Sequence, residues 1–301
     1  MSEKQVFLCA FVKKSIFIFE KISFNWYVIL NISIKKNTSG VVKMADKPVM
    51  TVIVPNYKTL DLTKLCLRSL RKYTDCSRIK VLVIDNESND ESVEYLRTLD
   101  WITLVERKTT GEGGPEMHAR ALDMAMEMVD TEFVLVIHTD TIMISDKWLD
   151  FLLGKINAAP NIAGVGSWKL EVVPPVKVFF KKIETAVRRM LGRKILDREH
   201  YFRSHCALYK SDAVRQTNGF YDNNSAGVTM FAILRDKGCD LPFIESEELA
   251  KYMRHLNHAT MILHPSAQSR KSSKPSKLRK LNSELEKLHA REILADDSLD
   301  K

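Results

Sequence analysis

Short apolar runs alternate along the first half of the chain with longer segments in which leucine and other apolar residues recur at helical spacing. Four runs have the length and composition of strands; they cover residues 50–54, 80–84, 101–105 and 133–137. Helices are predicted over the leucine-rich segment 60–70, from Asp90 onward, and over residues 116–129 and 148–156. Strands that are apolar on both faces and alternate with helices are typical of a parallel sheet covered on both sides. The sequence therefore predicts an α/β protein with a mostly parallel sheet and helices on both of its faces.

The two ends of the chain differ in pattern from this central part. Residues 1–43 mix apolar stretches with lysines and contain no uninterrupted apolar run of the roughly 18 residues that span a bilayer. They are either an aromatic-rich peripheral anchor or an upstream extension with Met44 as the working start; we favour the second, because Met44 leads directly into the first strand. We expect one domain over residues 44–265, followed over residues 266–301 by a basic linker and a C-terminal helix. In that helix, over residues 277–294, leucines recur at three-four-three spacing, a stripe that more often docks on its own domain than forms a coiled coil.

The formal net charge is +8, and the basic residues concentrate in two segments, 173–210 and 270–280. Such segments attract phosphate-bearing partners, which include nucleotides, anionic lipids and nucleic acids, and charge alone does not choose among them. The second segment is explained equally well as a solvated basic face. Residues 176–194 interleave basic with aliphatic side chains, which predicts an amphipathic helix that either covers the sheet or lies on an anionic membrane. Because no nucleic-acid-binding motif accompanies the basic residues, we expect no nucleic-acid partner.

The cysteine pattern indicates a reducing compartment. The five cysteines are an odd number, are widely spaced and form no CxxC pair, which argues against a disulfide framework. We therefore expect a cytoplasmic protein, with residues 176–194 as the segment that would contact the inner face of the membrane.

Two aspartates stand just beyond predicted strands. Asp85 directly follows residues 80–84, and Asp140 comes three positions after residues 133–137. Ligands of an open parallel sheet bind beyond the carboxyl ends of its strands. A single carboxylate there is often a helix cap or part of a turn, but acids at two strand ends of one sheet edge favour a site. The glycine-rich residues 111–114 are consistent with a phosphate-binding loop or with a mobile loop beside that site.

The residues around these aspartates resemble family 2 glycosyltransferases. Val-Ile-Val-Pro-Asn-Tyr at residues 52–57, followed by Asp-Asn-x-Ser-x-Asp-x-Ser at residues 85–92, is similar to the opening of that family. Residues 133–141 resemble the strand that ends in the family's DxD motif, and Trp148-Leu149 resembles the helix start that follows it. These motifs in combination carry the resemblance in the first half of the chain.

The second half resembles the family more weakly. Residues 218–220, Asn-Gly-Phe, and residues 235–238 are similar to the stretch around the acceptor site, so that the resemblance spans residues 49–265. It implies the GT-A fold, which is a Rossmann-like α/β fold, and a nucleotide-sugar donor. It also implies inverting transfer of the sugar to a hydroxyl of a glycan or lipid-linked acceptor.

The resemblance further implies roles for individual residues. The donor nucleotide would be held by six residues near the ends of the first, second and fourth strands: Pro55, Asn56, Tyr57, Asp85, Asn86 and Thr139. Asp140 would bind a divalent metal, Mn²⁺ or Mg²⁺, that offsets the charge of the departing nucleoside diphosphate. His255, in a stretch similar to the family's late His-Leu-x-x-Ala-Ser, would approach the same metal or the diphosphate, with His258 as the alternative.

Two positions depart from the family's pattern. His138 stands where the DxD motif begins with aspartate; it is either a further metal ligand, which would favour Mn²⁺ over Mg²⁺, or a strand-end histidine that hydrogen-bonds the backbone. The acidic pair whose aspartate deprotonates the acceptor hydroxyl falls on Ala226 and Gly227, where no carboxylate is present. Asp222 is the nearest replacement base. Three acids lie further away, and these too are explained as solvated surface residues: Glu245, Glu247 and Glu248.

Two hypotheses follow from this pattern. The first is an inverting hexosyltransferase that acts in cell-surface polysaccharide synthesis and depends on a metal. The second is a nucleotide-binding or scaffolding module that keeps the fold without transfer activity, and it is supported by the missing acidic pair and by His138.

Overall fold

The computed structural model describes residues 47–168, 200–222, 226–256, 259–263 and 275–301, which belong to one compact unit, Lys47–Lys301. The predicted N-terminal extension, the basic segment 176–194 and His258 lie outside the described residues. Among the described residues, no helix is long and apolar enough to cross a membrane.

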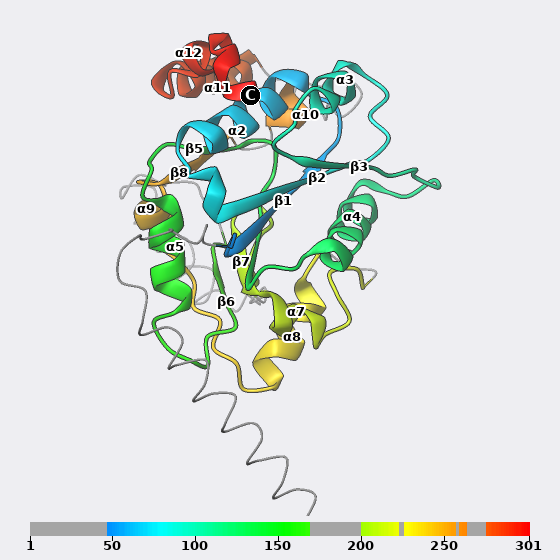
Figure 1. Ribbon diagram of the computed structural model, residues 1–301, viewed down its shortest axis with the longest axis vertical. Helices are drawn as coiled ribbons and strands as arrows, with labels where there is room; N and C mark the ends of the chain where they lie inside the picture. The colour runs from blue at the N-terminus through cyan, green and yellow to red at the C-terminus, as the bar shows by residue number, and fades with distance from the viewer. Residues whose placement is uncertain (1–46, 169–199, 223–225, 257–258, 264–274) are drawn as a thin grey trace, which may run out of the picture. The chain divides into compact units, whose positions relative to one another are not determined.

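A six-stranded sheet runs through the centre of the described part of the chain (Figure 1). Its strands, in spatial order, are β3 (Thr103–Glu106), β2 (Ile79–Asp85), β1 (Met50–Asn56), β4 (Phe133–Val136), β7 (Ala207–Lys210) and β6 (Gly164–Gly166). The first four are parallel to one another, β7 is antiparallel to β4, and β6 is antiparallel to β7 and therefore runs the same way as β4. The prediction of a mostly parallel sheet is confirmed, and all four predicted strands are present. The third begins later than expected, at Thr103.

Helices cover both faces of this sheet, as predicted (Figure 1). One face carries α2 (Leu60–Lys72), α3 (Glu91–Arg97) and α5 (Trp148–Ile156), and the other carries α4 (Gly114–Met128), α7 (Ser211–Arg215) and α8 (Val228–Asp236). Alternation along β1 accounts for the two cores. Val52 and Val54 pack with Leu65 of α2, whereas Ile53 packs on the opposite face with Leu122 of α4, because successive side chains of a strand point to opposite faces.

A second, two-stranded sheet was not predicted. It pairs β5 (Thr141–Met143) with β8 (Met253–His255) in antiparallel register, with Thr141 opposite His255. The short helices α9 (Ser246–Leu249) and α10 (Ala259–Leu263) precede and follow β8 in the sequence, whereas the 3₁₀ helix η1 (Cys76–Arg78) leads into β2 of the main sheet. Strands of three residues leave too little periodicity in a sequence to be recognised. Their pairing matters, because it brings residues that are more than a hundred positions apart to one edge of the main sheet.

The C-terminal segment differs from the single helix predicted over residues 277–294. It forms α11 (Pro275–Lys287), α12 (Ala290–Ala295) and the 3₁₀ helix η3 (Asp297–Asp300), with a break at His289, whose φ is 50°. Leu281 before the break and Ile293 after it both belong to the core beneath α2. The change of direction thus lets both helices bury apolar side chains in that core, and the expectation that this segment docks on its own domain is confirmed.

Candidate active site

The carboxyl ends of β1 and β2 carry a buried polar network around Asp85. Its carboxylate accepts hydrogen bonds from the side-chain amide of Asn56 (2.7 Å) and from the backbone N–H (3.0 Å) and hydroxyl (2.5 Å) of Ser88. The Asn56 amide also donates to Ser92, and its carbonyl oxygen accepts from the Thr63 hydroxyl of α2. Asn56 is fully buried, and Asp85 is 2% exposed. The side chain of Asn56 therefore acts from inside the fold, where it holds the two strand ends together.

The loops that leave these strands have unusual backbone conformations. Lys58 and Thr59 after β1, and Glu87 and Asn89 after β2, have φ values between 49° and 63°. Side chains disfavour this left-handed region, and Thr59 is β-branched, which makes it a clear outlier. The backbone N–H of Lys58 donates to the Ser88 hydroxyl (2.8 Å), so that the two loops support each other. Conformations of this kind cluster at ligand sites, where the surrounding structure compels them.

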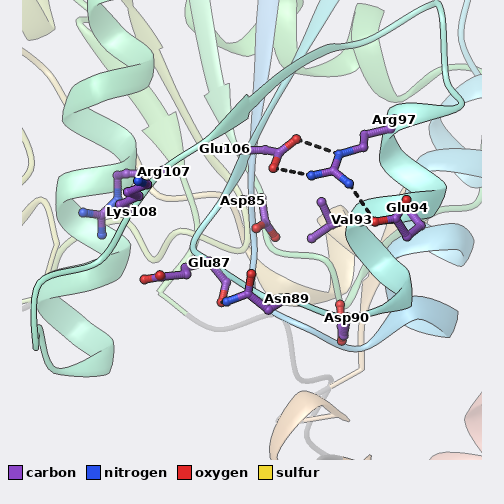
Figure 2. A pocket seen from close by; sticks show the side chains of 10 residues that line it. All are labelled: Asp85, Glu87, Asn89, Asp90, Val93, Glu94, Arg97, Glu106, Arg107 and Lys108. Atoms are coloured by element: carbon purple, nitrogen blue, oxygen red, sulfur yellow. Dashed lines mark hydrogen bonds and ion pairs between the residues drawn. The ribbon is translucent and has the colours of Figure 1, made fainter.

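A cavity of about 320 Å³ opens beside Asp85 (Figure 2). Val93 and Arg97 of α3 line one side of it and Lys108 lies on the other, beyond β3. The Arg97 guanidinium forms two hydrogen bonds to Glu106 across the cavity wall and lowers the pKa of that carboxyl. A carboxylate group accepts about four hydrogen bonds, and Asp85 receives three from the described residues, so one acceptor position remains for a ligand in the cavity.

Arg107 ties the predicted glycine-rich loop to the end of β2. Its Nε donates to the side-chain oxygen of Asn86 (3.0 Å), and its Nη1 donates to Glu112 (3.0 Å) in the loop. The side chains of Arg107 and Glu112 are only 6% and 8% exposed, and hydrogen bonding from Arg107 lowers the pKa of Glu112. At the other end of the loop, the Glu87 carboxylate accepts from the backbone N–H (2.9 Å) and hydroxyl (2.7 Å) of Thr109.

The remaining predicted donor residues stand around the same edge. Pro55 is partly buried, Tyr57 is 38% exposed with the Lys58 ammonium 5.2 Å from its ring centre, and Thr139 is 7% exposed beyond β4. Asn86 is buried against Arg107. Their contact with a nucleotide stays a prediction.

The structure brings the three predicted metal ligands together. The ligand atoms of His138, Asp140 and His255 all lie within 4.8 Å of one another; we call this group the metal triad. His138 and Asp140 follow β4, whereas His255 is the last residue of β8 and is brought to them by the pairing of β8 with β5. A backbone hydrogen bond from the Leu256 N–H to the Asp140 carbonyl (2.8 Å) extends this pairing. Nε2 of His255 is 3.1 Å and Nδ1 of His138 is 3.8 Å from Oδ1 of Asp140.

The chemistry of the metal triad fits a divalent cation. Oδ1 of Asp140 is buried, and although Nε2 of His255 lies 3.1 Å away, the oxygen accepts no well-formed hydrogen bond from the described residues. A buried carboxylate oxygen that is poorly hydrogen-bonded is costly unless a ligand completes its partners. Burial acts to raise the pKa of Asp140, but the adjacent His255 and His138 lower it to about 2. The His138 side chain is 38% exposed; its partial desolvation lowers its pKa, helped by the charges of His255 and Arg203 and opposed by Asp140. At neutral pH the site thus presents a carboxylate and a neutral imidazole, the forms that bind metal.

Two further histidines, which the sequence analysis missed, surround the metal triad. The His118 ring of α4 stands edge-on to His138 at 5.0 Å, and its buried Nε2 has no hydrogen-bond partner among the described residues. His205 lies just before β7; its ring is 4.8 Å from that of His255, and its Nε2 is 2.8 Å from the hydroxyl of Ser167. Neither residue belongs to a motif, and only the assembled sheet shows that they adjoin the site.

The candidate bases lie apart from the metal triad. Oδ2 of Asp222 accepts from the backbone N–H of Thr229 (2.9 Å) in the first turn of α8, as a capping residue does. Glu248 pairs with Lys155 at 2.8 Å, and Glu245 and Glu247 are exposed around α9. Among the described residues, none of these four carboxylates joins the metal triad. The base that would deprotonate the acceptor hydroxyl therefore stays unassigned.

Residues 51–217, more than half of the chain, match the family described as glycosyl transferase family 2. The chain belongs to this family and is a glycosyltransferase of the class that uses nucleotide-sugar donors. No curated protein matches its sequence significantly.

Solved structures of similar fold include glycosyltransferases from several organisms. Mannosyltransferase PcManGT from Pyrobaculum calidifontis, solved with GDP-Man and Mn²⁺, is 18% identical, with 90% of this chain and 76% of that chain covered and a TM-score of 0.49. TarS from S. aureus is 16% identical over 74% of this chain and 68% of that chain, with a TM-score of 0.47. Glucosyl-3-phosphoglycerate synthase from Mycobacterium tuberculosis, solved with Mn²⁺, UDP and glucosyl-3-phosphoglycerate, is 15% identical over 64% of this chain and 66% of that chain, with a TM-score of 0.42.

Proposed function

We propose that this protein is a metal-dependent, inverting hexosyltransferase that moves a sugar from a nucleoside diphosphate to a hydroxyl of a glycan or lipid-linked acceptor. The observation that carries the proposal is the metal triad. Three side chains that arrive from two distant parts of the chain converge at the sheet edge where the donor site of the family lies, and among the described residues the buried Oδ1 of Asp140 accepts no well-formed hydrogen bond.

The donor side would be organised by the network around Asp85. The free acceptor position of Asp85 suits an N–H of a nucleobase or a ribose hydroxyl, and the cavity beside it has room for one ring system. The loop tied down by Arg107 and Glu112 would form the wall next to the phosphates, with Lys108 as a cation at the rim. Because these groups are already held by hydrogen bonds, little conformational entropy would be lost when the donor binds.

The metal triad would hold the divalent cation through the Asp140 carboxylate and the imidazoles of His138 and His255. When bound, such a cation offsets the negative charge that the nucleoside diphosphate gains as the glycosidic bond breaks. The protein contributes the fixed position of the three ligands and the burial that strengthens their electrostatic effect. Imidazole ligands favour Mn²⁺ over Mg²⁺.

The test is metal-dependent hydrolysis of a panel of nucleotide sugars by the full chain, compared with its Asp140→Ala variant. We expect slow release of nucleotide from one donor with Mn²⁺, and a loss of at least a hundredfold in the variant, since a catalytic metal supplies several kcal/mol of charge stabilisation. A protein that binds no donor at all would refute the proposal.

A second function is favoured by one specific observation, the absence of a carboxylate at Ala226 and Gly227. A transferase without a base would become a nucleotide-binding or scaffolding module. Isothermal titration with nucleoside diphosphates separates the two: the module binds in the presence of Mn²⁺ yet releases no sugar with any acceptor.

A role in cell-surface polysaccharide synthesis, at the inner face of the cytoplasmic membrane, extends the proposal. It is supported by the basic residues between 173 and 210, which would attract anionic headgroups. Flotation with anionic vesicles at low salt tests it, and a protein that stays with the soluble fraction would rule out membrane contact.

A further inference from the structure

Trp168 and His138 lie just beyond the same edge of the main sheet, at equivalent positions along the strand direction. Each stands two residues beyond the end of its strand, Trp168 after Gly166 of β6 and His138 after Val136 of β4, and Ala207 of β7 pairs with both Gly166 and Val136. Since β4 and β6 flank β7 and run in the same direction, the ends of the two strands are separated across the sheet by two strand spacings, about 10 Å. Trp168 is thus the neighbour of the metal triad on the side away from the Asp85 cavity.

Aromatic side chains gather around Trp168 into what we call the aromatic cluster, formed by Trp168, His200, Tyr201 and Phe243. The Trp168 ring lies edge-on to His200 at 4.7 Å and to Tyr201 at 5.4 Å, and Phe243 lies 6.4 Å from His200. The guanidinium of Arg203 stands 5.2 Å from the ring centre of Trp168 and 5.3 Å from that of Tyr201. Rings and a cation therefore lie together at this edge.

The aromatic cluster is only partly buried, but it packs on side chains of the buried core. Phe243 is 39% exposed and His200 is exposed, whereas Phe243 rests on Phe202 (5.0 Å) and Phe231 (5.7 Å) of the core. A backbone hydrogen bond also holds the segment that carries Phe243, because the Ile244 N–H donates to the Gly166 carbonyl (2.8 Å). An exposed phenylalanine held in one position on a buried support is suited to contact a ligand.

A short series of contacts joins the aromatic cluster to the metal triad. Arg203 N–H donates to the Ser167 carbonyl (2.9 Å), the Ser167 hydroxyl lies 2.8 Å from Nε2 of His205, and the His205 ring lies 4.8 Å from that of His255. A group held on the aromatic cluster would therefore be close to the diphosphate of a bound donor.

The mixture of side chains indicates what that group is. Ligand sites combine apolar and aromatic walls with a few polar groups that fix orientation, and aromatic rings provide large, stiff contact surfaces. A sugar ring offers both kinds of partner: its C–H faces pack on aromatic rings, and its hydroxyls accept from a guanidinium or an imidazole. An acyl chain would need a continuous apolar groove, which the polar atoms of His200, Tyr201 and Arg203 interrupt.

We propose that Trp168, His200 and Phe243 form a subsite for a saccharide ring of the acceptor, with Arg203 donating hydrogen bonds to its oxygens. The inference rests on the proposed transferase function and narrows it, because it assigns the acceptor to carbohydrates and places the sugar next to the metal triad.

The test is saturation-transfer NMR on the full chain with a panel of methyl glycosides of glucose, galactose, mannose and N-acetylglucosamine. We expect at least one glycoside to bind, Phe243→Ala to weaken its binding about fivefold, and Phe243→Tyr, which keeps the ring, to stay within twofold of wild type. Met128→Ala is the matched control, since Met128 is a similarly exposed apolar side chain (48%) at the end of α4. His200→Ala serves as a second variant, and circular dichroism confirms the folding of each.

The outcomes separate this inference from the proposed function. Wild-type protein that hydrolyses a nucleotide sugar but binds none of the glycosides, or binds one equally well in wild type, Phe243→Ala and His200→Ala, overturns the saccharide subsite and leaves the transferase intact. Wild-type protein that neither hydrolyses nor binds a nucleotide sugar refutes the transferase itself. Loss of glycoside binding in Phe243→Ala and His200→Ala, with binding retained in Phe243→Tyr and Met128→Ala, supports the subsite.

Discussion

Replacing Arg68 with alanine tests whether the C-terminal segment stabilises the sheet edge that carries the site. The Arg68 side chain on α2 is 2% exposed and donates to Asp297 (2.6 Å), to both oxygens of Asp300 and to the Leu294 carbonyl. Tyr95 donates to the same Asp300 carboxylate (2.7 Å). Helix α2 begins two residues after Lys58, so this anchor lies on the element that leads directly out of the donor loop.

The expected loss can be estimated from the exposure of each partner. Removing one member of a buried ion pair costs about 3–5 kcal/mol because the other is left uncompensated. Here Asp300 is 22% exposed, but Asp297 is 89% exposed, and an exposed pair contributes only about 0–1 kcal/mol. We therefore expect Arg68→Ala to lower the free energy of unfolding by about 2–3 kcal/mol. With a urea m-value near 3 kcal/mol/M, the midpoint would fall by roughly 0.7–1 M.

Urea unfolding followed by circular dichroism measures this loss, with Arg78→Ala as the matched control. Arg78 also pairs with an aspartate, Asp150 at 2.7 Å, but the two side chains are 36% and 67% exposed, so its removal should cost no more than about 0.5 kcal/mol. Equal midpoints for the two variants would refute the argument that burial makes the Arg68 anchor strong.

The difference in unfolding free energy between wild type and Arg68→Ala should also change with pH, in a direction that the pKa of Asp300 determines. Burial acts to raise the pKa of Asp300, but hydrogen bonds from Arg68 and Tyr95 lower it overall. An unfolded aspartate titrates near 3.9, so the contribution of Asp300 is fully present above that pH and is lost as the pH falls below it. The difference in unfolding free energy between wild type and Arg68→Ala should shrink from pH 5 to pH 3; a difference that grew would contradict the assignment.

Two further predictions concern the site. His138→Asp, which restores the family's acidic pattern, should move the ratio of Mn²⁺- to Mg²⁺-supported nucleotide-sugar hydrolysis at least threefold towards Mg²⁺, because a carboxylate replaces an imidazole; an unchanged ratio would mean that His138 does not touch the metal. Glu112→Gln should raise the dissociation constant for a nucleoside diphosphate about threefold to tenfold and speed trypsin cleavage at Lys108, because Arg107 loses its charged partner. Unaltered cleavage would show that the loop does not depend on this pair.

The sequence predicts the first half of the fold well because its signals there are local. The strands over residues 80–84 and 133–137 are apolar on both faces, and the helix over residues 148–156 has the predicted bounds. Asp90 starts α3 as expected, since its carboxylate accepts from the backbone N–H of Ser92 (3.0 Å). Helix caps and apolar periodicity of this kind are determined by residues a few positions apart, so they can be recognised in a single sequence.

The second half is poorly predicted because its structure depends on contacts between distant residues. Strands β6 and β7 have three and four residues, too few to show alternation, and they are defined by their pairing with each other and by the pairing of β7 with β4. The break at His289 likewise depends on where Leu281 and Ile293 meet the core. No sequence motif marks His118 or His205, and they gain significance only from the ring contacts that the assembled sheet gives them.

The first half of the chain is well predicted from its sequence and the second half is not, yet both contribute to one site. The antiparallel register of β5 and β8 explains how. Thr141 pairs with His255, and this pairing sets Nε2 of His255 3.1 Å from the Asp140 carboxylate. A shift of one residue would turn the imidazole to the opposite face of the small sheet, and His205, whose ring lies 4.8 Å from it, would lose this neighbour as well. The same side of the site continues through Ser167 and Arg203 to the aromatic cluster. The segment after β4 therefore positions two residues of the metal triad, and the pairing with β8 positions the third beside the proposed acceptor side. A change that shifts this register should impair the proposed metal binding and saccharide binding together.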